Sequence, residues 1–215
     1  MARPVLYVLA GANGAGKSSI GGRLLESAGL TWFNPDTFAR KLIAATECDQ
    51  ETANSYAWHE GIRRLDEAVA QGLNHAFETT LGGTTLTAKI LDAARTHDVL
   101  VWFCGLSSPE QHIARVTARV AAGGHPIPEE RIRARYPRAQ LNLIKLMQHV
   151  SYIKVYDNSK EASADGTVPD PVLVLEMENG EVVWPAHDDF KELQRAPEWA
   201  KPVLEAALRG RSAQD

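Results

Sequence analysis

The chain has 215 residues, of which 44% are hydrophobic and 23% charged, and its formal net charge at pH 7 is −4. This composition is ordinary for a globular protein, and the negative charge argues against a broad electrostatic grip on nucleic acid or an anionic membrane. Its two cysteines, Cys48 and Cys104, are too few and too far apart for a disulfide framework or a zinc site. No run approaches the ~20 apolar residues of a membrane span, and the N-terminus leads directly into a strand pattern, so we expect a cytoplasmic protein.

The first predicted element is a short buried strand over residues 5–9, VLYVL, a run of apolar residues. Residues 11–18, GANGAGKS, follow it at once and match G-x-x-x-x-G-K-[ST], the phosphate-binding loop. Its glycines let successive backbone N–H groups point into one concavity, and the helix that follows adds the positive end of its dipole. Lys17 can then reach the β- and γ-phosphates of a nucleotide, and the Ser18 hydroxyl can ligate Mg²⁺. This context predicts triphosphate binding rather than a plain glycine-rich turn.

The remaining elements alternate between helix and strand. In chain order we predict a helix over 18–28, a strand over 31–34, helical structure over 35–72 with a break near 48–49, a strand over 74–78 and a helix over 85–96. A strand follows over 99–104, and then helices over 108–122, 129–136 and 138–150, where Pro137 kinks or interrupts the chain. The last predicted elements are a strand over 152–156, a surface loop over 159–171, a hairpin over 172–184 and a helix over 197–208. This order predicts an α/β fold in which helices flank a central parallel sheet, with a C-terminal β-hairpin and helix over 172–208. We expect a single domain over residues 1–215.

Polar residues follow several predicted strands, and ligands of parallel sheets bind at the carboxyl ends of the strands. Asp36 follows the second strand and is either a general base for an acceptor hydroxyl or an ordinary helix cap. Glu78 and Thr80 stand on alternate residues, so their side chains point the same way in an extended chain. They suit the hydroxyls of a sugar-like substrate, although Glu78 could orient Mg²⁺ through a water, or both could be a solvated strand end. Asp157 and Asn158 follow the last parallel strand.

Arginines recur at helical spacing in the segment over residues 108–150. The arginines are Arg115 and Arg119 in one helix and Arg131, Arg135 and Arg138 in the next. Gly123, Gly124 and two prolines make a hinge between the helices, so the segment could form a lid that closes over the phosphates. Any single arginine could instead lie on a solvated face and pair with Glu129 or Glu130, and His125 could bond a phosphate or shape the turn.

The ordered set of these motifs resembles the zeta-toxin-like P-loop kinases, specifically the small bacterial branch often labelled as predicted ABC-type ATPases. The motifs that carry the resemblance are residues 11–18, Asn34-Pro35-Asp36, Phe77-Glu78-Thr79-Thr80-Leu81, Arg119-Val120, residues 123–128, Arg135-Tyr136 and Asn142-Leu143. Together they cover about residues 5–158. The resemblance implies a three-layer P-loop kinase fold like that of adenylate and chloramphenicol-modifying kinases.

The resemblance also implies an enzyme that phosphorylates an alcohol group. Better-studied zeta toxins phosphorylate a sugar hydroxyl of UDP-N-acetylglucosamine with ATP or GTP, and an antitoxin partner is possible. Carried over by motif, the catalytic residues are Asp36, Lys17, Arg119 and Arg135. The nucleotide-binding residues are Gly11, Ala12, Asn13, Gly14, Ala15, Gly16, Lys17, Ser18, Ser19 and Asn158. Asp36, Glu78 and Thr80 are expected to bind substrate, and Ser18 to hold Mg²⁺.

Two other functions fit the same residues. The first is a small-molecule or antibiotic kinase of the chloramphenicol phosphotransferase type, with the same phosphate-binding parts and a different acceptor pocket. The second is a nucleotide-dependent switch or binding module, whose output is conformational and which transfers no phosphoryl group. A kinase needs Asp36 for turnover, whereas a switch tolerates its loss.

Overall fold

The computed structural model describes residues 2–18, 21, 25, 31–161, 169–186 and 188–211. Most of the predicted helix over 18–28, the candidate residue Ser19 and the middle of the predicted loop over 159–171 lie outside these residues. None of the helices in the described part of the chain combines the length and the apolar character needed to cross a membrane.

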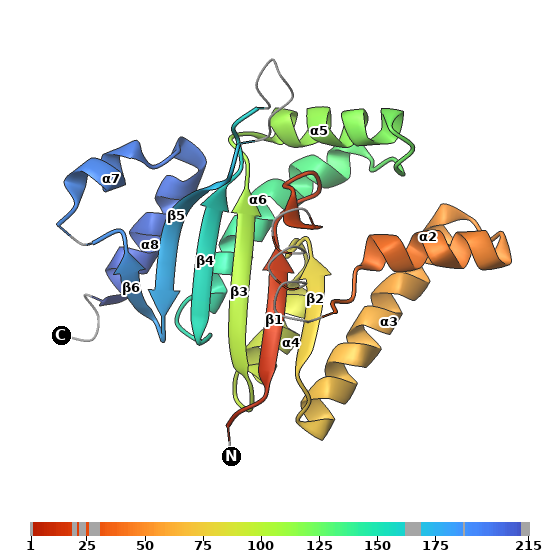
Figure 1. Cartoon of the computed structure of the whole chain (residues 1–215), viewed down its shortest axis with the longest axis horizontal. Coiled ribbons are helices and arrows are strands. Elements are labelled where there is room, and N and C mark those ends of the chain that lie inside the picture. The colour runs from red at the N-terminus through yellow and green to blue at the C-terminus, as the bar shows by residue number, and fades with distance from the viewer. Residues whose placement is uncertain are drawn as a thin grey trace.

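A single six-stranded sheet with the order β2-β1-β3-β4-β5-β6 forms the centre of the molecule (Figure 1). Four strands are parallel: β1 (Val5–Ala10), β2 (His75–Thr79), β3 (Asp98–Gly105) and β4 (Tyr152–Asp157). The predicted hairpin is β5 (Val172–Glu178) and β6 (Glu181–Trp184), and β5 pairs antiparallel with β4. The hairpin therefore extends the central sheet. Its Asn179-Gly180 turn has positive φ at both residues, as tight hairpin turns require.

The predicted strand over 31–34 is wrong, because this segment makes only one isolated bridge, Phe33 to Phe77. The Phe33 N–H donates to the Ala76 carbonyl at 2.8 Å, and its carbonyl accepts from Glu78 N–H at 2.9 Å. Pairing stops there because Pro35 has no N–H to donate and Asn34 already caps the following helix.

Eight helical segments have their bounds within the described residues. They are α2 (Pro35–Thr46), α3 (Gln50–Gln71), α4 (Thr84–Ala93), α5 (Pro109–Ala121), α6 (Glu129–Leu146), α7 (Phe190–Arg195), the short 3₁₀ helix η1 (Glu198–Ala200) and α8 (Lys201–Arg211). The predicted break near residues 48–49 is confirmed: Glu47 ends α2 in the left-handed region, and Asp49 caps α3 by accepting from Thr52 N–H. The sequence did not predict α7.

Of the kink or interruption predicted at Pro137, the interruption is wrong, because α6 continues through this residue from Glu129 to Leu146. The proline removes one backbone hydrogen bond, yet α6 buries Ile132 before it and Leu143 and Leu146 after it. Helices in proteins owe most of their stability to the packing of such a face. Burial on both sides of Pro137 therefore holds the helix together.

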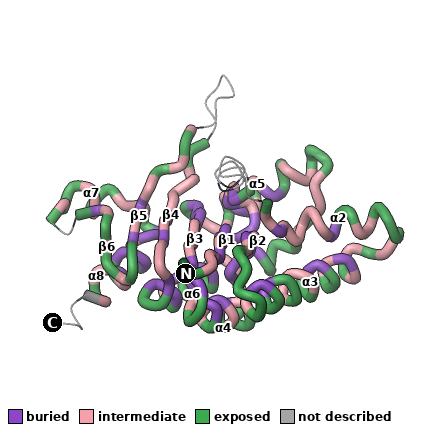
Figure 2. Tube along the Cα trace, turned by 60° about the horizontal axis from the view of Figure 1, so that its bottom comes forward, coloured by how far each residue is buried: buried purple, intermediate pink, exposed green. Residues whose placement is uncertain are grey.

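The hydrophobic core lies on both faces of the sheet. On one face, β-strand residues such as Val101 and Val155 pack with Leu143 of α6 and Val203 of α8, and α4, α6 and α8 lie together there (Figures 1 and 2). On the other face a smaller cluster contains Leu9, with Trp102 packed against it. The α2–α3 pair projects beside β2 at the edge of the sheet (Figure 1). The carboxyl ends of the parallel strands β1, β2, β3 and β4 lie on the same side of the sheet. The segments that follow these strands begin there, and the candidate site lies among them.

Candidate functional site

The loop after β1 has the backbone of an anion-binding nest. Gly11, Gly14 and Gly16 have φ values of +136°, +84° and +88°, which L-residues rarely adopt. A Cβ atom on Gly11 would lie 2.2 Å from the carbonyl oxygen of Cys104, and one on Gly14 would lie 2.8 Å from that of His112. The loop therefore packs against the ends of β3 and α5 so closely that only glycine fits at these two positions.

Lys17 is 7% exposed, and its Nζ donates to the carbonyl of Ala12 in its own loop at 3.2 Å. The same Nζ lies 3.6 Å from Glu78 Oε1, at the end of β2. Glu78 Oε2 accepts hydrogen bonds from the Ser18 hydroxyl and from Asn34 Nδ2, each at 2.8 Å. Glu78 therefore lies against the phosphate loop beside Ser18, where the sequence also allowed it to orient Mg²⁺.

Asn13, at the tip of the loop, is held by two residues from distant elements. Arg135 of α6 donates from NH1 to Asn13 Oδ1 at 2.8 Å, and His112 of α5 donates from Nδ1 to the Asn13 carbonyl at 2.7 Å. Burial lowers the pKa of His112 to about 4, so this ring is neutral near pH 7. Asn158 Nδ2, beyond β4, donates to the Ala15 carbonyl at 2.9 Å. The loop is thus fixed by its neighbours before any ligand binds.

Asp36 lies in the first turn of α2 but does not cap it, because Asn34 Oδ1 accepts from Thr37 N–H at 3.0 Å. Its carboxylate, 39% exposed, lies 3.8 Å from Arg119 NH1 and 3.7 Å from His125 Nε2. Burial lowers the pKa of His125, against the opposing effect of the Asp36 charge. Arg119 Nε and NH2 are buried without a hydrogen-bond partner among the described residues.

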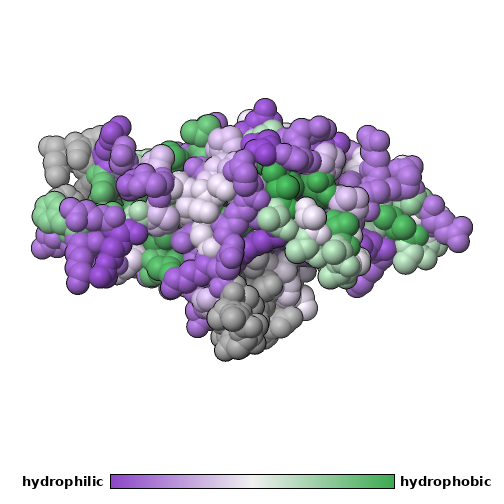
Figure 3. Space-filling view, turned by 90° about the horizontal axis from the view of Figure 1, so that it is seen from above, coloured by the Kyte–Doolittle hydropathy of each residue, from purple (hydrophilic) through white to green (hydrophobic). Residues whose placement is uncertain are grey.

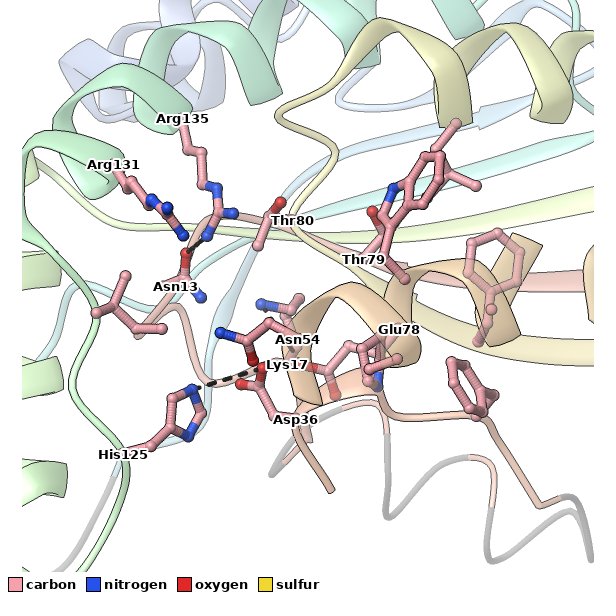
Figure 4. A pocket seen from close by; sticks show the side chains of 18 of the residues that line it. Asn13, Lys17, Asp36, Asn54, Glu78, Thr79, Thr80, His125, Arg131 and Arg135 are labelled. Carbon is pink, nitrogen blue, oxygen red and sulfur yellow. Dashed lines mark hydrogen bonds and ion pairs between the residues drawn. The ribbon is translucent and has the colours of Figure 1, made fainter. Parts of the chain in front are cut away.

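The arginines of the predicted lid do not all lie beside the pocket. Arg131 and Arg135 of α6 line the pocket and extend toward Asn13 (Figure 4), and burial lowers the pKa of Arg135. Arg115 instead donates to the carbonyls of Asn158 and Lys160, away from the pocket. The sequence named Glu129 and Glu130 as possible partners of a surface arginine, and Glu129 pairs with Arg133. The second half of α6 packs into the core, so the part of the predicted lid beside the pocket is residues 125–128 and the first turns of α6.

A pocket of about 230 Å³ joins these residues. Its polar side contains Asn13, Lys17, Asp36, Glu78, Thr79, Thr80, His125, Arg131 and Arg135 (Figure 4). The pocket therefore brings together five of the six predicted catalytic and substrate-binding residues, and the sixth, Arg119, reaches it only through its contact with Asp36. Of the predicted nucleotide-binding residues, Asn13 and Lys17 line the pocket.

The sequence did not predict the part of the pocket lining that α3 contributes. It consists of Asn54, Ala57, Trp58, Gly61 and Ile62 of α3, with Phe33, Phe77 and Leu86. The α3 residues stand at positions i, i+3, i+4, i+7 and i+8, which place them on one helix face. That spacing was present in the sequence, but it is equally typical of a helix packed on a core.

Oxygen ligands for Mg²⁺ are present at the loop. Mg²⁺ prefers one or two protein oxygens together with waters and substrate phosphates. The adjacent hydroxyl of Ser18 and carboxylate of Glu78 suit such a set. The described residues contain no cluster of three or more His, Cys, Asp or Glu side chains that could hold a metal by themselves. A site shared with the phosphates of a nucleotide is therefore the kind that these residues fit.

Two solved structures share the fold. A crystal structure of AvrRxo1-ORF1:-ORF2 with ATP matches with a TM-score of 0.65 and 15% identity, over 92% of this chain and 65% of that one. This sequence thus spans just under two thirds of that chain. The PezAT chromosomal toxin–antitoxin system of the human pathogen Streptococcus pneumoniae matches with a TM-score of 0.60 and 16% identity, over 98% of this chain and 85% of that one. No protein of curated function matches the sequence significantly.

A family model gives the identification. The model described as Zeta toxin matches residues 1–164, which include the phosphate loop, Asp36, Glu78 and both arginine-bearing helices. The match covers well over half of the 215 residues. The chain therefore belongs to the zeta toxin family.

Proposed function

We propose that this protein is a kinase that transfers the γ-phosphoryl group of ATP or GTP to a hydroxyl of a small acceptor. The observation that carries the proposal is the position of Asp36. It faces the pocket that also contains Lys17, and Asn34 caps α2 in its place. A carboxylate that is not needed as a cap and lines the same pocket as the lysine of a phosphate loop is suited to general-base catalysis.

In this reaction the loop amides and Lys17 bind the β- and γ-phosphates. Asp36 accepts the proton of the acceptor hydroxyl as its oxygen bonds to the γ-phosphorus. The bond between the γ-phosphorus and the β–γ bridging oxygen breaks, and the nucleoside diphosphate leaves. Mg²⁺, held by Ser18 and oriented by Glu78, would supply charge neutralisation for the phosphates. The guanidinium groups of Arg131 and Arg135 lie where they can stabilise charge on the transferred group.

The acceptor proposed from the family resemblance is a nucleotide sugar such as UDP-N-acetylglucosamine, bound beside Asp36, Glu78 and Thr80. The apolar wall formed by α3 favours a second candidate, a small-molecule kinase of the chloramphenicol phosphotransferase type. An antitoxin partner is also proposed, since the similar PezAT structure belongs to a toxin–antitoxin system. A cytoplasmic location, where nucleoside triphosphates are available, completes the proposal.

The substitution Asp36→Asn separates a kinase from a nucleotide switch. It keeps the shape of the side chain and removes the base, so we expect phosphoryl transfer from γ-labelled ATP to fall by about 10²- to 10⁴-fold. Affinity for Mg²⁺–ATP, measured by calorimetric titration, should stay within a few-fold of the wild-type value.

The control is Asp92→Asn on α4, whose carboxylate is exposed and paired with Arg95. This variant should transfer phosphate like the wild type. Full turnover by Asp36→Asn would refute the role of Asp36 as base, and a wild-type protein that binds ATP but phosphorylates no alcohol would favour the switch.

A further inference from the structure

The 80–83 loop, which joins β2 to α4, has a backbone conformation that its own residues do not favour. Thr80 lines the pocket, as does Thr79 at the end of β2. Leu81, the next residue, has a φ of +51°, in the left-handed region that residues other than glycine rarely adopt. Such a conformation persists only where the surrounding structure holds it. The contacts of this loop therefore bear on the shape of the pocket.

Asn142 of α6 holds the 80–83 loop from outside the pocket. Its Nδ2 donates to the Leu81 carbonyl at 2.8 Å and to the Gly83 carbonyl at 3.3 Å. Asn142 is 4% exposed, and a buried amide is stable only where its polar atoms are hydrogen-bonded. The two hydrogens of the amide match these two carbonyls.

Leu81 is also held by its other groups. Its N–H donates to Thr79 Oγ1 at 2.9 Å, and its side chain is 1% exposed within the main core cluster. Leu81 is thus fixed through its N–H, its carbonyl and its side chain, and Thr80 lies between two held residues. The place of Thr80 in the pocket therefore depends on contacts that Thr80 does not make itself.

The same helix also holds the phosphate loop. Arg135 stands seven positions before Asn142, two turns away on one face of α6, and donates to Asn13 Oδ1 at 2.8 Å. A Cβ atom on Gly82 would lie 2.7 Å from Cγ of Arg135, so α6 and the 80–83 loop are in close contact. One helix therefore fixes the phosphate loop and the 80–83 loop relative to each other.

The part of the pocket lining that α3 contributes is mainly apolar, with Ala57, Trp58 and Ile62. Figure 3, which looks at the carboxyl ends of the parallel strands, shows hydrophobic side chains gathered between hydrophilic ones on the α2–α3 side of the molecule. In a pocket with such a lining, a small number of placed polar groups orients the ligand. The Thr80 hydroxyl is one of these groups, so a shift of the 80–83 loop would change how an acceptor is oriented.

We infer that Asn142 is a positioning residue for the acceptor. Through the carbonyls of Leu81 and Gly83 it holds the 80–83 loop so that the Thr80 hydroxyl is presented to the acceptor. Asn142 itself does not line the pocket, and the sequence marked it only as part of a motif, without a role. The inference rests on the proposed kinase function and adds a residue to it.

The substitution Asn142→Leu tests the inference, because it keeps a side chain of similar shape and removes both donors. The acceptor probe is whichever of UDP-N-acetylglucosamine and chloramphenicol the wild-type full chain phosphorylates with Mg²⁺ and γ-labelled ATP. We expect the KM for that probe to rise about tenfold, since two carbonyls are left unpaired and the loop shifts. The Kd for Mg²⁺–ATP, measured by calorimetric titration, should stay within a few-fold of the wild-type value. An acceptor KM equal to that of the wild type would overturn the inference.

A milder variant covers the case in which Asn142→Leu does not fold. The hydroxyl of Asn142→Ser is too short to reach both carbonyls, so the acceptor KM should still rise, by about threefold. An unchanged KM in this variant counts against the inference in the same way.

The matched control is Leu146→Val, one turn further along α6. Leu146 is fully buried in the core cluster, so this variant loses packing but no hydrogen bond to the 80–83 loop. It should lower the melting temperature and leave the acceptor KM at the wild-type value. If Leu146→Val raises the acceptor KM as much as Asn142→Leu does, the effect is a general loss of stability and the inference fails.

A double-mutant cycle with Thr80→Val tests whether Asn142 acts through Thr80. Thr80→Val removes the hydroxyl and keeps the shape of the side chain, so it should raise the acceptor KM by itself. Adding Asn142→Leu to Thr80→Val should then raise the KM by less than about twofold more, because both changes remove the same contact. Effects that multiply would show that the two residues act independently, contrary to the inference.

The two proposals fail in different ways. If the wild type phosphorylates neither probe, the proposed kinase function fails and the inference fails with it. If the wild type phosphorylates a probe and Asn142→Leu keeps the wild-type acceptor KM, the kinase function stands and only the role of Asn142 is wrong.

Discussion

The two sides of the pocket are built in opposite ways. On the loop side, backbone geometry and buried polar contacts hold each group, as with Asn13 between Arg135 and His112. On the α3 side, Trp58 and Ile62 present apolar side chains, and Asn54 is the polar side chain that α3 contributes. The backbone N–H groups of the loop bind phosphate, which all nucleotides share. The ligand preference of the α3 side, in contrast, depends on side chains and can change when they are substituted. Donor binding and acceptor choice are thus separable in this fold.

The largest effect should come from removing the charge on the loop side. Lys17→Ala leaves Glu78 without its cation and the phosphates without theirs. We expect the Kd for Mg²⁺–ATP to rise at least 100-fold, or by about 3 kcal/mol. Calorimetric titration measures it, with the surface variant Lys89→Ala, which loses only a pair with Asp66, as control. Equal ATP affinity of Lys17→Ala and the wild type would contradict the account of the loop side.

The second prediction concerns His112 of α5, which holds the phosphate loop through the Asn13 carbonyl. The pKa of His112 is about 4 in the folded chain, against 6.5 for an unperturbed histidine. Between these pH values the unfolded chain binds a proton that the folded chain does not, so stability falls as pH falls from 6.5 toward 4. From this difference in pKa we expect His112 to contribute roughly 3 kcal/mol to the loss of stability.

The variant His112→Asn keeps a donor for the Asn13 carbonyl and removes the titrating ring. Its unfolding free energy, measured in denaturant at pH 7 and pH 4.5, should fall less between the two values than that of the wild type. The same fall in both proteins would show that the burial of His112 does not control acid stability.

The third prediction compares two arginines of α6, one in the pocket and one on the surface. Arg135→Ala breaks the contact with Asn13 and removes a cation from the pocket, so we expect kcat to fall about tenfold. Arg133 pairs with Glu129 and Glu110 on the surface of α6. Arg133→Ala should therefore keep wild-type kcat and cost about 1 kcal/mol of stability or less. Steady-state kinetics and thermal unfolding of both variants decide between these roles, and equal losses of kcat would contradict them.

The smallest effect is expected on the α3 side. A Cβ atom on Gly61 would lie 2.9 Å from Cε1 of Phe33, so Gly61→Ala has to displace the ring slightly. We expect the KM for the acceptor to change by a few-fold while the KM for ATP stays constant. A change confined to the KM for ATP would mean that this wall belongs to the nucleotide.

Local signals predicted the loop side. The strand over 5–9, the glycines of the loop and Lys17 each depend on a few neighbouring residues. The same holds for the break near residues 48–49 and for the helix that begins at residue 108. The alternation of elements likewise predicted the parallel strands and the C-terminal hairpin.

Contacts between distant residues were beyond the reach of the sequence. Arg135 meets Asn13 across 122 positions, and the position of Glu78 beside Ser18 depends on the register of β2 against β1. The helical face of α3 was visible as a spacing, but nothing in the sequence distinguished a pocket wall from a core face. The effect of Pro137 was also not predictable from the sequence alone. Burial of the residues around it outweighs the local tendency of proline to end a helix.

A crystal structure of the chain with Mg²⁺ and a non-hydrolysable ATP analogue would show where the donor nucleotide binds. We predict that the triphosphate lies in the nest of residues 11–18, with its γ-phosphate between Lys17 and the Asp36 side of the pocket. An empty nest, or a γ-phosphate that points away from Asp36, would contradict it.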